Sequence, residues 1–262
     1  MMATAGPIAL QGIEGDAFTA RGFATDPADV GVRIDPARAV ESVDMLLTRC
    51  LLDANGRPPT LETVRGWTVA RRLDALIAIR QAGGDGIERI AVRCGETGCG
   101  EPFEVDVELA ACRGGATAAG VDVEVAGERL HVRLPTGAEQ ARWARERTPL
   151  RLVAATLVGR ETAVDEAVVA AVDAALAAAD PAREPILEPA CPACGTVGQH
   201  PLRLEAELLS AFVRLQRRWL EQIARLAAVY HWSEAEIARL PAWRRAFYLG
   251  RIDAGPSAEV AR

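Results

Sequence analysis

The chain has 262 residues, half of them hydrophobic and a quarter charged, which indicates one large or two modest globular domains and excludes an intrinsically disordered protein. The formal net charge of −6 argues against a protein held on nucleic acid mainly by phosphate contacts. No apolar run approaches the length of a membrane span, and residues 1–15 lack the pattern of a signal peptide, so we expect a cytoplasmic protein.

The first third of the chain is expected to be helical after an irregular start. Residues 1–35 are rich in Gly, Ala and Asp, and we expect an irregular N-terminal arm. Residues 36–85 have apolar residues at helical spacing on both sides of a Gly- and Pro-rich break at 55–59, which predicts a helical hairpin. Thr60 is a suitable N-cap for its second helix, which is expected to continue to the Gly83-Gly84 turn.

The middle of the chain alternates apolar and charged residues, as strands do. Residues 87–93 and 103–109 predict a hairpin around a cysteine-containing turn, and residues 121–134 predict another around Ala126-Gly127. After a second cysteine-containing turn, Leu202, Leu204 and Ala206 are expected to form a further strand. We therefore predict a β domain made of residues 86–134 and 186–206.

Two helical segments complete the chain. Residues 135–185 are expected to be an inserted helical segment, in which Thr136 caps the first helix and a stripe of residues four apart marks the last: Val164, Val168, Val172 and Leu176. Residues 207–250 predict a C-terminal helical segment with a long helix to Tyr230, a capping box at Ser233 and Glu236, and a last helix from Pro241 to Gly250. Residues 251–262 are expected to be a disordered tail.

Four of the six cysteines occur in pairs, Cys94 with Cys99 and Cys191 with Cys194. A pair separated by two to four residues can bind one face of a tetrahedral metal ion, and a Gly after the second cysteine lets the backbone turn beneath it. The two half-sites together predict one structural zinc site in a reducing compartment. The fold class is then α+β, with split zinc-ribbon-like β-hairpins, an inserted helical segment and helical N- and C-terminal parts.

Other interpretations of the cysteines are weaker. A redox role for Cys191-Pro-Ala-Cys194 would need a βαβ setting, and a disulfide would need an oxidising compartment. A catalytic zinc keeps an open coordination position, which four thiolates would close, although His200 could replace one cysteine. Because the chain also lacks a nucleophile elbow and a Gly-rich phosphate loop, we expect no enzyme and no small-molecule substrate.

The C-terminal segment combines arginines with more than half of the aromatic residues. Trp, Tyr and Arg dominate binding energy at protein interfaces, which makes this segment the candidate partner-binding region. Its candidate residues are Trp219, Trp232, Trp243, Arg244, Arg245 and Tyr248. A basic stripe on the long helix leaves open a zinc-ribbon nucleic-acid-binding protein as the alternative function; its members are Arg214, Arg217, Arg218 and Arg225.

Several stretches resemble the T4-type baseplate hub assembly proteins of contractile phage tails and of phage-tail-like contractile injection systems. They are Asp180-Pro-Ala, Ile186-Leu-Glu-Pro-Ala-Cys191-Pro-Ala-Cys194-Gly, Leu134-Pro-Thr136 and residues 226–249, which include Tyr230-His-Trp-Ser-Glu and Leu240-Pro-Ala-Trp-Arg-Arg. The resemblance covers about residues 35–250 and is most specific in its C-terminal third. The first cysteine pair departs from it, with four intervening residues instead of a tighter spacing, as do Leu202 and Leu204, which replace aromatic residues.

The resemblance implies a non-enzymatic protein that helps to build or load the baseplate hub. It also implies that Cys94, Cys99, Cys191 and Cys194 bind zinc, and that the C-terminal helical segment docks onto a partner. The expected partners are baseplate hub or spike proteins, and the expected location is the cytoplasmic assembly site or the assembled tail particle.

Overall fold

The computed structural model describes residues 8–10, 17–114, 120–180 and 184–254. Helices predominate among these residues, and the strands form small antiparallel sheets of two or three strands. The protein is therefore of the α+β class, as the sequence predicts.

The N-terminal arm is more regular than the sequence predicts. Strand β2 (Phe18–Ala20) pairs antiparallel with β1 (Ile8–Leu10) on one side and with β3 (Leu51–Leu52) on the other. Phe18 and Ala20 are buried and Thr19 is exposed, which is the alternation of a half-buried strand. The prediction of an irregular arm over residues 1–35 is thus wrong for β2, because three alternating residues are too few to stand out; residues 1–7 and 11–16 lie outside the described part.

The helical hairpin predicted for residues 36–85 is present, but its second helix is broken. It consists of α1 (Ala39–Cys50), α2 (Leu61–Gly66) and α3 (Val69–Ala82). Thr60 caps α2 as predicted, and Thr68 caps α3. Between them, the Trp67 carbonyl accepts from the Gly137 amide and the Val69 amide donates to the Pro135 carbonyl, at 3.0 and 2.9 Å. The backbone between α2 and α3 thus forms hydrogen bonds with residues 135–137 and does not continue the helix.

A buried guanidinium occupies the same junction. Arg72 of α3 is 1% exposed and lies 2.7 Å from a carboxylate oxygen of Asp44 on α1. It also donates to the Val64 carbonyl at 2.9 Å. The Cα of Gly137 packs so closely that an added Cβ would lie 2.5 Å from Nη1 of Arg72. A larger residue at position 137 would therefore clash with Arg72 unless one of the two moved.

The first cysteine hairpin projects from this helical body. Strands β4 (Ile87–Arg93) and β5 (Pro102–Glu108) pair along their whole length, and a 3-10 turn, Leu109–Cys112, follows. Ile90, Val107 and Leu109 are buried in the main core with α1, α3 and the following long helix. The base of the hairpin is thus fixed by packing, whereas its far end carries the cysteine turn.

The second hairpin belongs with the inserted helices. Strands β6 (Gly120–Val125) and β7 (Glu128–Arg133) pack on α5 (Leu150–Leu157) and α6 (Glu166–Ala179), and α4 (Gly137–Glu146) connects them to the body. Leu130 and Val132 share a separate hydrophobic core with Val168 and Val172. The prediction that residues 121–134 belong to the same domain as the cysteine hairpins is therefore wrong. The apolar face of the β6–β7 hairpin instead covers the stripe of apolar residues predicted on the last inserted helix, which is α6.

The strand predicted over Leu202, Leu204 and Ala206 is also wrong. After the two-residue strands β8 (Ile186–Leu187) and β9 (His200–Pro201), helix α7 (Leu204–Tyr230) begins at Leu204. Leu204, Leu208 and Phe212 are buried on one face of the helix, a spacing of four that overrides the short alternation. Helices α8 (Glu234–Arg239) and α9 (Ala242–Asp253) follow, and α9 passes Gly250 without ending.

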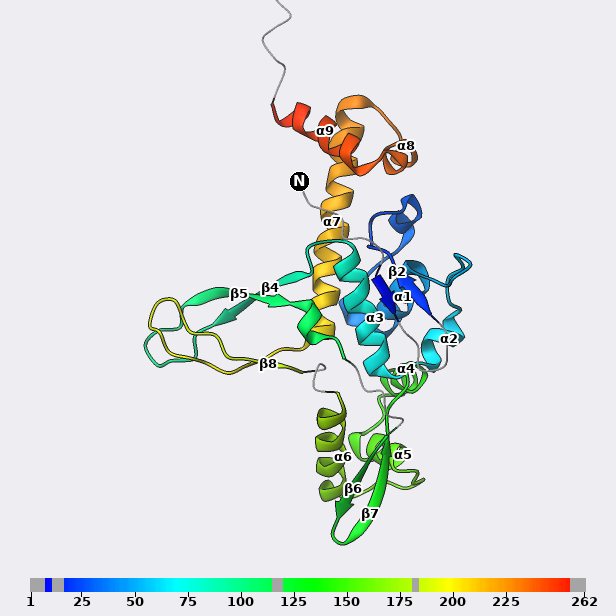
Figure 1. Ribbon diagram of the computed structural model, residues 1–262, viewed down its shortest axis with the longest axis vertical. Helices are drawn as coiled ribbons and strands as arrows, with labels where there is room; N and C mark the ends of the chain where they lie inside the picture. Colours follow the sequence, from blue (N-terminus) through cyan, green and yellow to red (C-terminus); the bar gives the residue numbers. More distant parts are fainter. Residues whose placement is uncertain (1–7, 11–16, 115–119, 181–183, 255–262) are drawn as a thin grey trace, which may run out of the picture.

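Helix α7 is the spine of the molecule (Figure 1). The body packs along its first half, α8 and α9 fold back on its last turns, and the cysteine hairpins extend sideways from its start. The β6–β7 module lies at the opposite end from α9. This arrangement leaves the cysteine hairpins, the inserted module and α9 as three separate projections.

Candidate metal centre

The cysteines lie in two turns that the fold brings together. Cys94 and Cys99 occupy the turn between β4 and β5, and Cys191 and Cys194 occupy the loop between β8 and β9. The two hairpins run side by side away from the body, with these turns near their ends (Figure 1). The predicted meeting of two half-sites that are distant in sequence is confirmed.

The four sulfur atoms are spaced as ligands of one metal ion. The Sγ atoms of Cys94 and Cys194 are 3.6 Å apart, those of Cys99 and Cys191 are 3.9 Å apart, and all four lie within 4.8 Å of one another. A tetrahedral site with Zn–S bonds of about 2.3 Å places its sulfurs about 3.8 Å apart. A disulfide would require about 2.05 Å, so the cysteines are free thiols, and their spacing fits a shared cation.

Glycine makes both turns possible. Gly100 follows Cys99 with φ +64°, and Gly195 follows Cys194 with φ +76°, a left-handed conformation that residues with a Cβ rarely adopt. The turns close through backbone hydrogen bonds from the Cys94 amide to the Glu101 carbonyl and from the Cys191 amide to the Thr196 carbonyl, each 2.9 Å. An added Cβ would meet nothing within 4 Å at either position, so glycine is favoured here by the left-handed φ and not by a lack of space.

Backbone amides point at three of the sulfurs. The Glu96 amide donates to Cys94, the Glu101 amide to Cys99 and the Thr196 amide to Cys194. Each donor lies two residues after its cysteine, so the turn itself supplies hydrogen bonds that favour thiolate over thiol. Such outer contacts orient ligands and tune their basicity in metal sites.

The pKa values of two of the thiols are shifted in opposite directions. Hydrogen bonds from the Thr196 hydroxyl and amide lower the pKa of the Cys194 thiol to about 6. The pKa of Cys94 rises to about 12, because burial and the hydrogen bonds among the four sulfurs outweigh the Glu96 amide. Cys194 therefore ionises more readily than Cys94, whose thiolate form is opposed by burial and by hydrogen bonds with the neighbouring sulfurs. A divalent cation at the centre would stabilise both thiolates.

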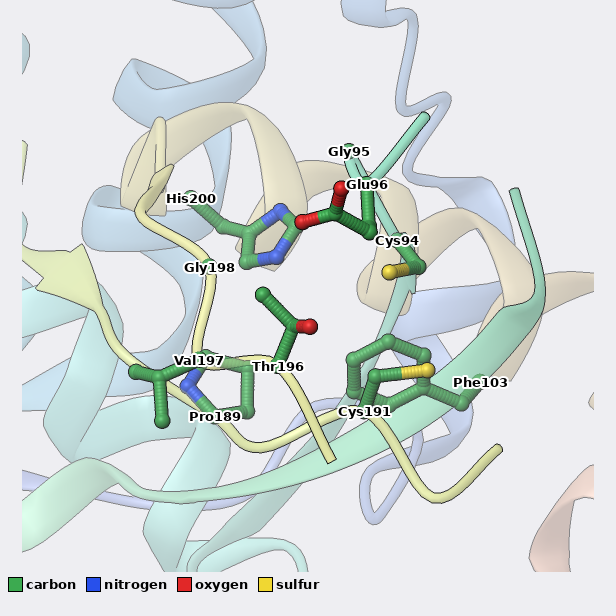
Figure 2. Close-up of a pocket in the computed structure, with 10 residues that line it drawn as sticks. All are labelled: Cys94, Gly95, Glu96, Phe103, Pro189, Cys191, Thr196, Val197, Gly198 and His200. Atoms are coloured by element: carbon green, nitrogen blue, oxygen red, sulfur yellow. The ribbon is translucent and has the colours of Figure 1, made fainter. Parts of the chain in front are cut away.

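His200 is beside the cluster but outside it. It lines a cavity of about 180 Å³ next to the cysteines, together with Glu96, Phe103 and Thr196. In Figure 2 the Cys94 and Cys191 sulfurs lie to the right of the cavity, and the His200 ring lies at its upper left, near Gly198. The ring stands edge-on to Phe103 with centroids 6.3 Å apart. The ligand set within reach of one ion in the described residues consists of the four sulfurs.

The candidate partner-binding residues differ in exposure. Trp219 is buried, and Trp232 is half-buried, stacked on Tyr230 at 4.7 Å and packed edge-on against Tyr248. Trp243 on α9 is 71% exposed. Arg244 lies above the Tyr248 ring, and Arg245 is half-buried and donates to the Leu240 carbonyl.

A second exposed aromatic residue of the C-terminal segment lies near Trp243. Phe247 is 59% exposed and follows Trp243 by four positions on the same helix, so the two side chains lie on one face. The spacing alone could have indicated this pair. Leu249, on the opposite face, is the buried residue that anchors α9 to α7.

No protein-family model, curated protein or solved structure matches this chain. None of the helices in the described ranges combines the length and the apolarity that a bilayer crossing requires. The interpretation of the site therefore depends on its own geometry.

Proposed function

We propose that this chain is a non-enzymatic assembly factor or minor component of the baseplate hub in a contractile phage tail or a phage-tail-like injection system. The proposal combines the resemblance of residues 226–249 with the exposed pair Trp243 and Phe247, which lies inside that stretch. The partners would be hub or spike proteins, met at a cytoplasmic assembly site.

The metal in this proposal is a structural Zn²⁺ bound by Cys94, Cys99, Cys191 and Cys194, which makes the paired hairpins a split zinc ribbon. Four sulfur ligands at tetrahedral spacing suit zinc and complete its coordination shell. A complete shell has no position for substrate, so the ion would fix the two hairpins against each other rather than catalyse a reaction.

The observation that carries the assembly role is the exposed face of α9. Trp243 and Phe247 present two large aromatic side chains to solvent, with Arg244 and Arg251 exposed on the same helix. Aromatic residues and arginine are the usual anchors of protein interfaces. Leu249 packs the opposite face of α9 against α7, so the aromatic pair lies on a helix whose position is fixed.

The alternative, a zinc-ribbon nucleic-acid-binding protein, has less support. Three arginines of the predicted basic stripe pair with carboxylates: Arg214 with Glu88, Arg217 with Glu221 and Arg225 with Asp253. These pairs leave less free positive charge for phosphates than the sequence alone suggests.

Co-expression with hub and spike proteins, followed by purification through a tag on this chain, tests the proposal. Trp243→Asp and Phe247→Asp are expected to lose the co-purifying protein by at least about tenfold, because aromatic interface anchors contribute 2 kcal/mol or more. Leu150→Asp is the matched control, since Leu150 is 74% exposed on α5, a separate module. Failure of any hub or spike protein to co-purify, together with salt-sensitive retention on DNA, would favour the alternative.

A further inference from the structure

A cavity of about 230 Å³ lies where α3, β4, α7 and α9 meet, away from the cysteine turns. Four arginines from three helices line it: Arg80 of α3, Arg214 and Arg218 of α7, and Arg245 of α9. Among the described residues that line it, one carries a carboxylate, Glu88 of β4. This concentration of positive charge is unusual in a chain whose net charge is −6.

Glu88 is already engaged. Its carboxylate, nearly buried, accepts from Nε of Arg80 at 2.9 Å and from Nη2 of Arg214 at 2.8 Å. One negative charge thus serves two guanidiniums, and the pair of arginines keeps a net positive charge toward the cavity. The repulsion that Glu88 would otherwise exert on an entering anion is therefore compensated.

The other two guanidiniums, those of Arg218 and Arg245, have no carboxylate partner in the part of the chain that the structure describes. None of the ion pairs in the described ranges includes Arg218 or Arg245. Arg245 donates to a backbone carbonyl of Leu240, and burial lowers the pKa of its guanidinium. A half-buried cation without a counter-ion has a desolvation cost, which a bound anion would reduce.

The wall also holds an unpaired hydrogen-bond donor. Trp219 lines the cavity and is 4% exposed, and its indole Nε1 has no partner among the described residues. Buried polar groups are ordinarily hydrogen-bonded, so this N–H is an unsatisfied donor in a residue of the cavity wall.

We propose that this cavity binds a small dianion of the phosphate type, held between Arg218 and Arg245 with Arg214 at its side. The guanidinium fork matches the oxygens of a phosphoryl group, and two unpaired positive charges match a dianion. The cavity is smaller than the roughly 300–1,000 Å³ of ordinary small-molecule sites, which favours a single oxyanion over a nucleotide. Arg218 belongs to α7 and Arg245 belongs to α9. The bound anion therefore links α9, which carries the exposed aromatic pair, to α7.

Calorimetric titration of the full-length, metal-loaded protein with sodium phosphate tests this site, at pH 8 and constant ionic strength. The wild type is expected to bind one equivalent saturably. Arg218→Gln and Arg245→Gln are each expected to weaken the affinity about tenfold or more, because each removes a charge-assisted contact. Arg217→Gln is the matched control: it is the neighbouring arginine on α7, it pairs with Glu221, and it does not line the cavity, so its affinity should stay within about twofold of wild type.

Two further ligands define the chemistry. Glycerol phosphate that binds as well as phosphate would support a phosphoryl group carried by a larger molecule, and weaker binding would support the free ion. Acetate that matches phosphate would overturn the dianion. Absence of saturable phosphate binding, or equal weakening in Arg217→Gln and Arg218→Gln, would overturn the site itself, provided that thermal melts show all variants folded.

Discussion

The Sγ atoms of Cys94 and Cys194 are 3.6 Å apart although 100 residues separate them in the chain. The loop that this contact closes contains the whole β6–β7 module with its own core. The β8–β9 ladder is two residue pairs long, with one further bridge between Ala190 and Val197, so only a few strand pairs hold the second cysteine loop. A metal ion shared by both loops is therefore the main link expected between the hairpin ends.

Replacing Cys191 and Cys194 with Ser is expected to abolish metal binding and to lower the melting temperature. Removal of two of four ligands leaves no tetrahedral site, and the binding free energy of a structural zinc is part of the folding free energy. We expect a decrease of about 5 °C or more, the shift that a few kcal/mol produces in a chain of this size. Metal content by mass spectrometry and melting by circular dichroism measure the two effects.

Cys112→Ser is the matched control for this experiment. Cys112 is a half-buried free thiol outside the cluster, so its replacement should leave the metal content unchanged. A doubly substituted protein that retains one equivalent of metal and an unchanged melting temperature would contradict the shared site.

Cys194 is expected to be the first thiol that iodoacetamide modifies in the metal-free protein. It is exposed, and the Thr196 hydroxyl and amide lower its pKa to about 6, so it is largely thiolate at pH 7. Cys112 should react much more slowly because burial raises its pKa. Thr196→Val removes one donor and should move the pH midpoint of Cys194 alkylation upward. Peptide mass spectrometry gives the order of modification; metal-loaded protein that reacts as fast at Cys194 would argue against coordination.

Much of this structure could be predicted where sequence specifies local chemistry. The capping boxes at Thr136 with Glu139 and at Ser233 with Glu236 both form, because they need only residues three apart. The Ala126-Gly127 turn adopts positive φ at both residues, as a two-residue hairpin requires. The cysteine cluster was predictable for the same reason, since each half-site is a local motif and only their meeting is long-range.

The errors arise where distant contacts decide between local alternatives. Leu202 and Leu204 alternate as in a strand, yet the buried face that continues through Leu208 makes Leu204 the first residue of α7. Trp67 interrupts a helical pattern because its carbonyl pairs with Gly137, 70 positions later (137 − 67 = 70). The cationic cavity depends on α9 folding back on α7, which no spacing in the sequence encodes.

Gly137→Ala is expected to destabilise the protein by about 1–3 kcal/mol, the cost typical of overpacking. The new Cβ would lie 2.5 Å from Nη1 of Arg72, and that guanidinium cannot move away freely because it is held by Asp44 and Val64. Gly250→Ala is the matched control, since its Cβ would meet nothing within 4 Å inside α9. It should stabilise the helix by about 0.5–1 kcal/mol. Urea unfolding measures both; equal effects of the two substitutions would show that the close contact at Arg72 does not matter.

Glu139 makes a contribution to stability that acid should remove. Its carboxylate accepts from Arg133 and from the Thr136 amide, and the Arg133 guanidinium holds its pKa below the ordinary value. Because the pKa of Glu139 is lower in the folded than in the unfolded protein, protonation of this carboxylate favours unfolding. The contribution of Glu139 to stability is therefore complete above about pH 5 and is lost as the pH falls through the pKa of the folded state. Glu139→Gln should therefore be less stable than wild type by about 1 kcal/mol at pH 7, with a smaller difference at pH 3.5. Urea unfolding across this range measures it, with Glu146→Gln, an exposed position on the same helix, as the control. A wild-type advantage that is the same at both pH values would mean that packing, and not the charge of Glu139, stabilises the start of α4.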